Sequence, residues 1–198
     1  MKIKNKIFQN HTKNSFEAVA LEIFRFQVKN NSVYKNYLNL LNVIPSNVKK
    51  LEQIPFLPIE LFKQKDVVCK SNNIDAIFTS SGTGGTRSKH IVNDLDIYEK
   101  SFTSGFEYFY GDILGYTILA LLPSYRSGSS LIYMCEKLMK HSMKRENGFF
   151  LKEQQELINL LLELESQNRK TLLIGVSFAL LDFAQKYPTK LKNTIIME

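Results

Sequence analysis

The chain has 198 residues and a formal net charge of +7, with 44% hydrophobic and 23% charged residues. This balance excludes an intrinsically disordered chain and indicates a globular protein with a substantial core. No apolar run is long enough for a membrane span or a signal peptide, and the lysines form no stripe of the kind that binds nucleic acid. We therefore expect no nucleic-acid partner. Two cysteines are too few for a disulfide framework, so we expect a cytoplasmic protein.

The first 65 residues are predicted to form a helical segment that packs on the main domain. Apolar residues recur at helical spacing over residues 15–27, which predicts an amphipathic helix with Asn14 or Ser15 as its N-cap. A second helix is predicted over residues 33–41. Three prolines then interrupt the pattern and indicate an extended connection.

Strands alternate with helices from residue 66 to the end of the chain. The predicted strands cover residues 75–79, 116–122, 171–174 and 193–197, and the predicted helices cover residues 95–110, 130–141, 152–166 and 178–187, the last one capped by Ser177. This alternation predicts an α/β fold with a mostly parallel sheet flanked by helices. Ligands of open α/β sheets lie just beyond the carboxyl ends of the strands, and the last predicted strand leads directly into Glu198. We therefore expect the domain of residues 66–198 to be truncated at its C-terminus.

A segment of small polar residues follows the first predicted strand of this domain. Residues 79–88 contain three Gly, three Thr, three Ser and one Arg. Glycine lets backbone N–H groups approach an anion, hydroxyl groups donate to phosphate oxygens, and Arg87 and Lys89 add positive charge. We predict a nucleotide-phosphate site here, with a flexible surface loop as the alternative. The predicted cofactor contacts are Thr79, Ser80, Ser81, Gly82, Thr83, Gly84, Gly85, Thr86 and Ser88.

Two widespread phosphate-binding patterns do not fit this segment. Counted from Gly82, both the Walker A loop and the dinucleotide-binding fingerprint require a glycine at position 87. That position is occupied by Arg87. The segment therefore belongs to neither class.

Several other polar residues are weaker candidates for a site. Ser124 and Tyr125 follow a buried strand, where contact with a ligand is favoured, although an exposed turn fits as well. His90 directly follows the loop and either approaches a phosphate or carboxylate or is an ordinary surface histidine. The histidines lack partners at metal-ligand spacing, so no metal site built from protein ligands is predicted. Asp94 and Asp96 are predicted to be helix caps rather than magnesium ligands.

The two cysteines and a group of aromatic residues have plainer interpretations. Cys135 lies on the apolar face of a predicted helix and is expected to be buried, whereas Cys69 follows two valines and is the more accessible thiol. Neither is predicted to be catalytic. Four aromatic residues fit the core better than an acyl-binding pocket. They are Phe102, Phe106, Phe109 and Tyr110.

The order of residues in the loop, Ser80-Ser81-Gly82-Thr83-x-Gly85, resembles the phosphate loop of the adenylate-forming superfamily. Further matches resemble one branch of it, the LuxE-type acyl-protein synthetases, also called long-chain-fatty-acid–protein ligases. This resemblance extends over roughly residues 54–198. Its additional matches are His90–Val92 with Tyr98 and Ser101 downstream, Leu121–Tyr125, Ser129–Met134, Gly148–Leu151 and Ile174–Phe183.

The resemblance implies an activity, cofactors and roles for residues. The activity is ATP-dependent conversion of a fatty or other carboxylic acid to an acyl-adenylate, followed by transfer to a thiol on a protein or carrier. ATP and Mg²⁺ would be the cofactors, and an acyl reductase is among the candidate partners. By this resemblance Arg87, Lys89 and Glu198 are the catalytic candidates. His90, Ser124, Tyr125 and Gly175 are the candidates for substrate binding.

The sequence departs from the family pattern at three points. Gly84 stands where the family has Thr, and the Pro-Lys pair at the end of the loop has no match, so Lys89 is its nearest equivalent. Glu198 corresponds to the first residue of an acidic, glycine-rich segment of the family. We therefore expect the 198 residues alone to be inactive. The alternative is a non-catalytic module that keeps the fold and binds an acyl group, a nucleotide or a protein.

Overall fold

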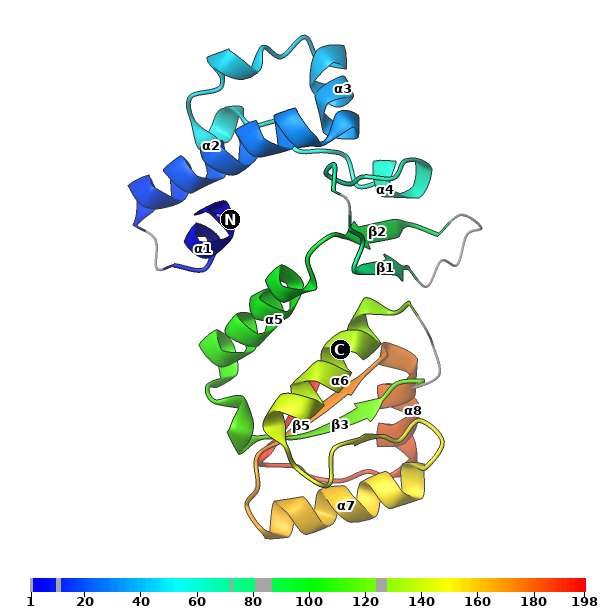
Figure 1. Cartoon of the computed structure of the whole chain (residues 1–198). Helices are drawn as coiled ribbons and strands as arrows, with labels where there is room; N and C mark the ends of the chain where they lie inside the picture. The colour runs from blue at the N-terminus through cyan, green and yellow to red at the C-terminus, as the bar shows by residue number, and fades with distance from the viewer. Residues whose placement is uncertain (1, 10–11, 72, 81–86, 124–127) are drawn as a thin grey trace. The chain divides into compact units, whose positions relative to one another are not determined.

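Figure 1 shows a computed structural model of the chain, which describes all residues except 1, 10–11, 72, 81–86 and 124–127. The chain divides into two compact units, residues 1–101 and residues 102–198. The predicted boundary between residues 65 and 66, and the packing of the N-terminal segment on a main domain, stay predictions.

The first unit begins with three helices, α1 (Lys2–Ile7), α2 (Lys13–Asn30) and α3 (Ser32–Leu40). The predictions of helices over residues 15–27 and 33–41 are confirmed, whereas α1 was not predicted. The predicted N-cap of α2 was wrong, because the helix begins before Asn14. Its cap is Thr12, whose Oγ1 accepts a hydrogen bond from the Ser15 N–H at 3.3 Å.

A small hydrophobic core joins α2 and α3 to the extended stretch that follows them. Its buried members are Leu21, Phe24, Tyr34, Leu38 and Val48. The rings of Phe24 and Tyr34 meet edge to face, with centroids 6.1 Å apart. Short turns, η1 (Pro45–Asn47), η2 (Leu51–Gln53) and α4 (Leu61–Gln64), carry the chain onward. The Tyr34 hydroxyl donates to the Pro55 carbonyl oxygen at 2.7 Å and thereby fixes the extended stretch to α3.

A two-stranded antiparallel hairpin follows in the same unit, made of β1 (Ala76–Thr79) and β2 (Lys89–Val92). The predicted strand over residues 75–79 is confirmed, and β2 was missed. The next helix, α5 (Leu95–Tyr110), has the predicted bounds and runs across the division between the units. Asp94 caps it as predicted, because its Oδ1 accepts from the Ile97 N–H at 3.4 Å.

The second unit is built on a four-stranded sheet with the order β4-β3-β5-β6, in which every neighbouring pair is parallel. The strands are β3 (Thr117–Leu121), β4 (Gly148–Phe149), β5 (Thr171–Gly175) and β6 (Thr194–Met197). The helices are η3 (Ile113–Gly115), α6 (Ser130–Ser142), α7 (Gln154–Ser166) and α8 (Ser177–Lys186). The predicted α/β fold with a parallel sheet flanked by helices is confirmed, although β4 was missed.

Two hydrophobic clusters cover the two faces of this sheet. Successive strand residues point to opposite faces, so Ile118 and Ala120 pack with Cys135 of α6 on one face. Leu119 and Leu121 pack with Leu157 of α7 on the other. All residues of β3 and β5 are buried. In Figure 1, α6 lies on one side of the sheet and α7 and α8 on the other.

Polar side chains stabilise the end of the sheet at which its parallel strands begin. The Asn147 Oδ1 accepts from the Ile118 N–H at 2.8 Å, and Arg169 binds both the Glu146 carboxylate and the Thr117 hydroxyl. Desolvation would raise the pKa of Glu165, but hydrogen bonds from the Lys192 and Asn193 N–H groups and from Thr194 outweigh it and hold that pKa below its ordinary value. This end of the sheet therefore has a structural role.

No helix in the part of the chain that the structure describes combines the length and apolar character needed to cross a membrane.

Candidate functional site

The glycine-rich loop connects the two strands of the β1–β2 hairpin. At its base the Ser80 N–H donates to the Ser88 carbonyl oxygen, and the Ser88 N–H donates to the Ser80 Oγ, both at 3.1 Å. Thr79 stands opposite Lys89 in the last registered pair before the loop. The hairpin thus holds both ends of the loop together.

The tip of this loop is outside the described residues, so its predicted contacts stay predictions. They are Ser81, Gly82, Thr83, Gly84, Gly85 and Thr86. The described residues of the loop are Thr79, Ser80, Arg87 and Ser88, and of these Arg87 is exposed and the others are partly buried. The structure thus pairs Thr79, the last residue of β1, with Lys89 and bonds Ser80, which follows β1, to Ser88 of the returning chain.

The positive charge beside the loop is accessible. Lys89 Nζ lies 3.5 Å from Asp66 Oδ1, and the two side chains are 57% and 63% exposed. Such an exposed pair is weak and screened by salt, so Lys89 can exchange Asp66 for another anion. Asp66 could not be predicted from the sequence, because the fold alone brings together these two residues, which are 23 positions apart.

His90 is oriented by a neighbouring aromatic ring. Its imidazole meets the ring of Phe62 in α4 edge to face, with centroids 6.2 Å apart. Because successive strand side chains point to opposite faces, His90 and Lys89 face opposite sides of the hairpin. His90 shares its side with its cross-strand partner Phe78. His90 therefore does not contact a ligand that Lys89 binds on the other face of the hairpin. A role for His90 in substrate binding stays a prediction.

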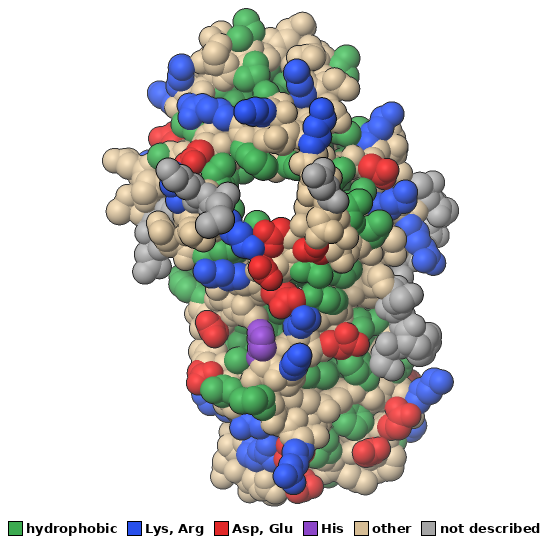
Figure 2. Space-filling model, viewed as in Figure 1, with side chains coloured by type: hydrophobic (Ala, Val, Ile, Leu, Met, Phe, Trp, Pro, Cys, Tyr) green, Lys and Arg blue, Asp and Glu red, His purple; other side chains and the backbone are tan. Residues whose placement is uncertain are grey.

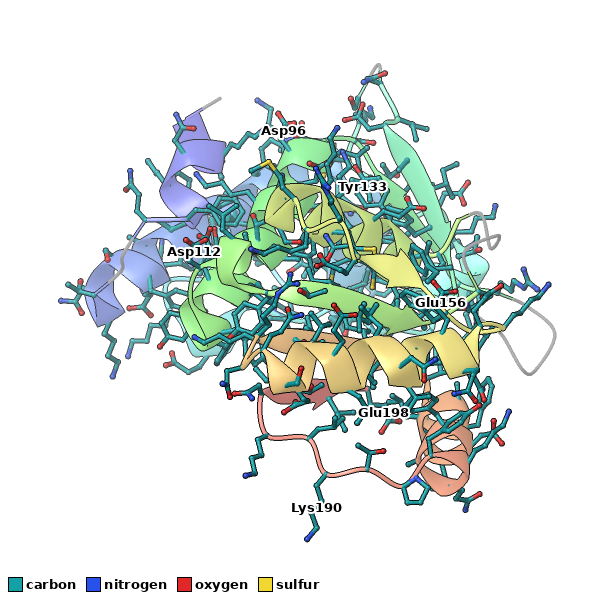
Figure 3. All side chains as sticks on the ribbon, turned by 90° about the horizontal axis from the view of Figure 1, so that it is seen from below. Asp96, Asp112, Tyr133, Glu156, Lys190 and Glu198 are labelled. Carbon is teal, nitrogen blue, oxygen red and sulfur yellow. The ribbon has the colours of Figure 1, made fainter. Side chains whose placement is uncertain are left out.

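The other described candidates lie in the second unit, at the carboxyl edge of the parallel sheet. Gly175 ends β5 and Glu198 follows β6, and the two strands are paired up to Ile174 and Met197. Figure 3 shows Glu198 at the end of β6, whereas Lys190 lies on the loop that leads into that strand. Ser124 and Tyr125 follow β3 and are outside the described residues.

Ser177 does not have the capping role that the sequence predicted. It is the first residue of α8, and the N-cap position is occupied by Val176, which has no side-chain cap. The Ser177 hydroxyl instead contacts the Glu198 carboxylate. This contact links the start of α8 to the end of β6, at the end of the sheet where α/β folds bind ligands. Both side chains are exposed.

Gly175 has a steric role in the structure. A Cβ at this position would lie 2.8 Å from the Leu180 Cγ and 3.1 Å from the Leu121 Cβ. Glycine is therefore required for α8 to pack closely against β5. Its predicted role in substrate binding stays a prediction.

Neither cysteine has the environment of a nucleophile. Burial raises the pKa of Cys135 to about 12, so its thiolate is scarcely populated at neutral pH. Burial also raises the pKa of Cys69, although its hydrogen bond to the Gln27 Oε1 at 3.2 Å opposes the shift.

Three of the four aromatic candidates pack into the core as expected, namely Phe102, Phe106 and Tyr110. Phe109 is exposed instead. Among the residues that the structure describes, no three His, Cys, Asp or Glu side chains gather in a way that would hold a metal ion.

Comparison with known proteins places these features in a family. The LuxE acyl-protein synthetase family matches residues 6–116, which is more than half of the chain. The chain therefore belongs to the LuxE acyl-protein synthetase family. The matched region contains the whole β1–β2 hairpin. It begins nearer the N-terminus than the resemblance described above and ends before β3.

A named relative agrees with this assignment. A long-chain-fatty-acid–luciferin-component ligase of Photorhabdus luminescens is 31% identical over 72 residues, which are 36% of this chain. The match covers 61% of the relative, so the chain spans less than two thirds of that protein's length. No solved structure matches the chain significantly.

Proposed function

We propose that the chain carries the ATP-binding loop of an acyl-protein synthetase that activates a long-chain fatty acid. The observation that carries the proposal is the β1–β2 hairpin, where Ser80 and Ser88 close the base of a glycine-rich loop beside Arg87 and Lys89. The hairpin lies within the residues that match the family. The name of the relative supports a long-chain fatty acid as the substrate.

The chemistry of the hairpin suits a triphosphate. Consecutive backbone N–H groups and hydroxyl groups donate hydrogen bonds to phosphate oxygens, and a closed loop base lowers the entropy lost when the ligand binds. Arg87 and Lys89 contribute positive charge on an exposed surface. Mg²⁺ is usually held by substrate phosphates with one or two carboxylates, so it would arrive with ATP. When bound, Mg²⁺ would neutralise part of the phosphate charge.

In the proposed reaction a carboxylate oxygen of the fatty acid attacks the α-phosphorus of ATP. The bond from that phosphorus to the β-phosphate oxygen breaks, and pyrophosphate leaves. A thiolate of the acceptor then attacks the acyl carbon, AMP leaves, and an acyl thioester forms. Arg87 and Lys89 stabilise charge on the phosphates, and a catalytic role for Glu198 is proposed from the family resemblance alone. We further propose a cytoplasmic location and a protein or carrier as acceptor, with an acyl reductase among the candidates.

The phosphate contact is tested by comparing the affinities of ATP and AMP for the parent chain and for Lys89→Gln. Loss of one charged hydrogen bond is expected to weaken ATP binding about tenfold. AMP is expected to change little, because it lacks the β- and γ-phosphates. Lys63→Gln, an exposed lysine of α4 in the same unit, is the matched control. Equal ATP affinity in the Lys89 and Lys63 variants would contradict the assignment.

The ligase reaction is tested on the natural protein that carries this chain. Exchange of labelled pyrophosphate into ATP is expected only when a long-chain fatty acid is present. If no carboxylic acid supports exchange while ATP still binds, the chain is a nucleotide-binding module and not a ligase.

A further inference from the structure

Residues 23–51 carry a concentration of positive charge that the proposed ATP site does not use. This segment contains five cations and no carboxylate. All five are exposed, and none pairs with a carboxylate among the residues that the structure describes. They are Arg25, Lys29, Lys35, Lys49 and Lys50.

The carboxylates that flank this segment on the N-terminal side are already engaged. Glu22 forms an ion pair with Lys6 at 2.7 Å, and Glu17 accepts a hydrogen bond from the Leu51 N–H at 2.8 Å. On the other side Glu52, the second residue of η2, is exposed. The five cations of the segment therefore outnumber the flanking carboxylates that are not already engaged.

An apolar group lies at the end of α3 within the same segment. Tyr34 and Leu38 direct the inner face of the helix into the core, so Leu40, two residues beyond Leu38, points away from it. Leu40 is 82% exposed, Ile44 is 60% exposed, and Leu41 between them is 46% exposed. Figure 2 shows Lys and Arg side chains with hydrophobic side chains between them over α2 and α3.

We propose that this surface, formed by the five cations with Leu40, Leu41 and Ile44, binds an anionic phospholipid bilayer. Lysine and arginine clusters of this size are attracted to anionic headgroups. Exposed aliphatic side chains gain free energy by entering the boundary between headgroups and acyl chains. The cations and the aliphatic side chains lie in one segment of the first unit. An anionic bilayer can bind both, because it offers charged headgroups and an apolar boundary beneath them.

Two other anionic partners fit less well. Protein interfaces are depleted in Lys and enriched in Arg, whereas four of these five cations are Lys. Single-stranded nucleic acids are held by aromatic side chains that stack on bases, whereas the most exposed apolar side chains here, Leu40 and Ile44, are aliphatic and the aromatic Phe26 is only 44% exposed. The inference goes beyond the proposed function and does not depend on ATP binding.

The test is cosedimentation of the full chain with vesicles of phosphatidylglycerol, with vesicles of phosphatidylcholine as the neutral comparison. Binding to phosphatidylglycerol alone is expected, and 1 M salt should abolish it, because the Debye length then falls to about 3 Å. The double variant Lys49→Gln, Lys50→Gln should bind about 25-fold more weakly, at about fivefold for each cation. Leu40→Ser should weaken binding about tenfold.

Matched variants in the second unit separate this surface from general effects. The double variant Lys190→Gln, Lys192→Gln removes the same charge at exposed positions, and Leu181→Ser removes a leucine that is 61% exposed. Both should bind vesicles like the parent, and all variants should keep the parent's thermal midpoint because the altered side chains are exposed.

Three results would overturn the proposal. They are no cosedimentation with phosphatidylglycerol, equal binding to phosphatidylcholine, or equal losses in the test and control variants. Binding of an acidic carrier protein without binding of vesicles would also overturn it and would assign the surface to a protein partner.

Discussion

Ser80 and Ser88 close the base of the glycine-rich loop with two hydrogen bonds of different kinds. One joins the Ser80 N–H to the Ser88 carbonyl oxygen, and the other joins the Ser88 N–H to the Ser80 Oγ, both at 3.1 Å. The hydroxyl of Ser80 therefore has a structural task besides any contact with a phosphate. The side chain of Ser88 takes no part in either bond.

This asymmetry predicts different effects for substitutions at the two serines. Ser80→Ala removes the acceptor for the Ser88 N–H and should lower the free energy of unfolding by about 1 kcal/mol, with weaker ATP binding. Ser80→Thr keeps the oxygen and should restore both, and Ser88→Ala should leave stability nearly unchanged. Urea unfolding and ATP titration measure the two effects. A Ser88→Ala variant as unstable as Ser80→Ala would contradict the proposed closure.

The Asp66–Lys89 ion pair predicts opposite effects on ligand binding for its two members. The pair is exposed, so Asp66→Asn should change the free energy of unfolding by less than about 1 kcal/mol. It should strengthen ATP binding, because Lys89 loses a competing anion. Lys89→Gln should weaken that binding. Calorimetric titration at low salt distinguishes the two, and weaker binding in both variants would mean that the intact pair, rather than free Lys89, receives the nucleotide.

Gly175 and Gly105 form a matched pair for a test of packing. Gly175→Ala places a Cβ against Leu180 and should destabilise the chain by about 1–3 kcal/mol. Gly105 lies in α5 with no atom within 4 Å of an added Cβ, so Gly105→Ala should stabilise by up to about 1 kcal/mol. Thermal unfolding measures both. Truncation of Leu180 to Ala should relieve part of the clash, and a neutral Gly175→Ala would show that α8 moves freely.

The Glu146–Arg169 pair predicts how stability depends on pH. The hydrogen bond from Arg169 holds the pKa of Glu146 at about 2, below its ordinary value of 4.5. A carboxyl whose folded pKa is lowered stabilises above its unfolded pKa, and this contribution is lost as the pH falls through its folded pKa. Glu146→Gln should therefore be less stable than the parent by about 1–2 kcal/mol at neutral pH.

The difference between the parent and Glu146→Gln should shrink between pH 4.5 and about 2. Thermal midpoints across this range provide the measurement. Glu156→Gln, an exposed carboxylate in the first turn of α7, is the control and should leave the pH profile nearly unchanged. A constant difference between parent and Glu146→Gln down to pH 2 would refute the assignment.

The sequence predicted the elements with long periodic patterns, and it missed the short ones. Helix α5 and strands β3, β5 and β6 were recognised because each has a sustained apolar pattern. Strand β4 has two residues, and β2 begins with Lys89 and His90, so neither carries such a pattern. Ser177 was predicted as a cap from its residue type, but the contact with Glu198 depends on strand β6 lying beside β5.

The candidate site was predicted in part for the same reason. The loop could be located because its glycines and hydroxyl residues are contiguous in the sequence. Its partners Asp66 and Phe62 could not, because they meet Lys89 and His90 only through tertiary packing. The need for glycine at position 175 could not be predicted either, because it depends on how close Leu180 lies in the folded chain.

The central claim is that the loop between β1 and β2 binds the phosphates of ATP. Calorimetric titration of Mg²⁺-ATP into the parent chain and into a Gly82→Asp, Thr83→Ala double variant tests it most directly. Saturable binding by the parent, lost in the variant while the thermal midpoint is retained, is the predicted result. Binding that is equal in both chains would place the nucleotide elsewhere, and no binding by the parent would contradict the claim for this chain.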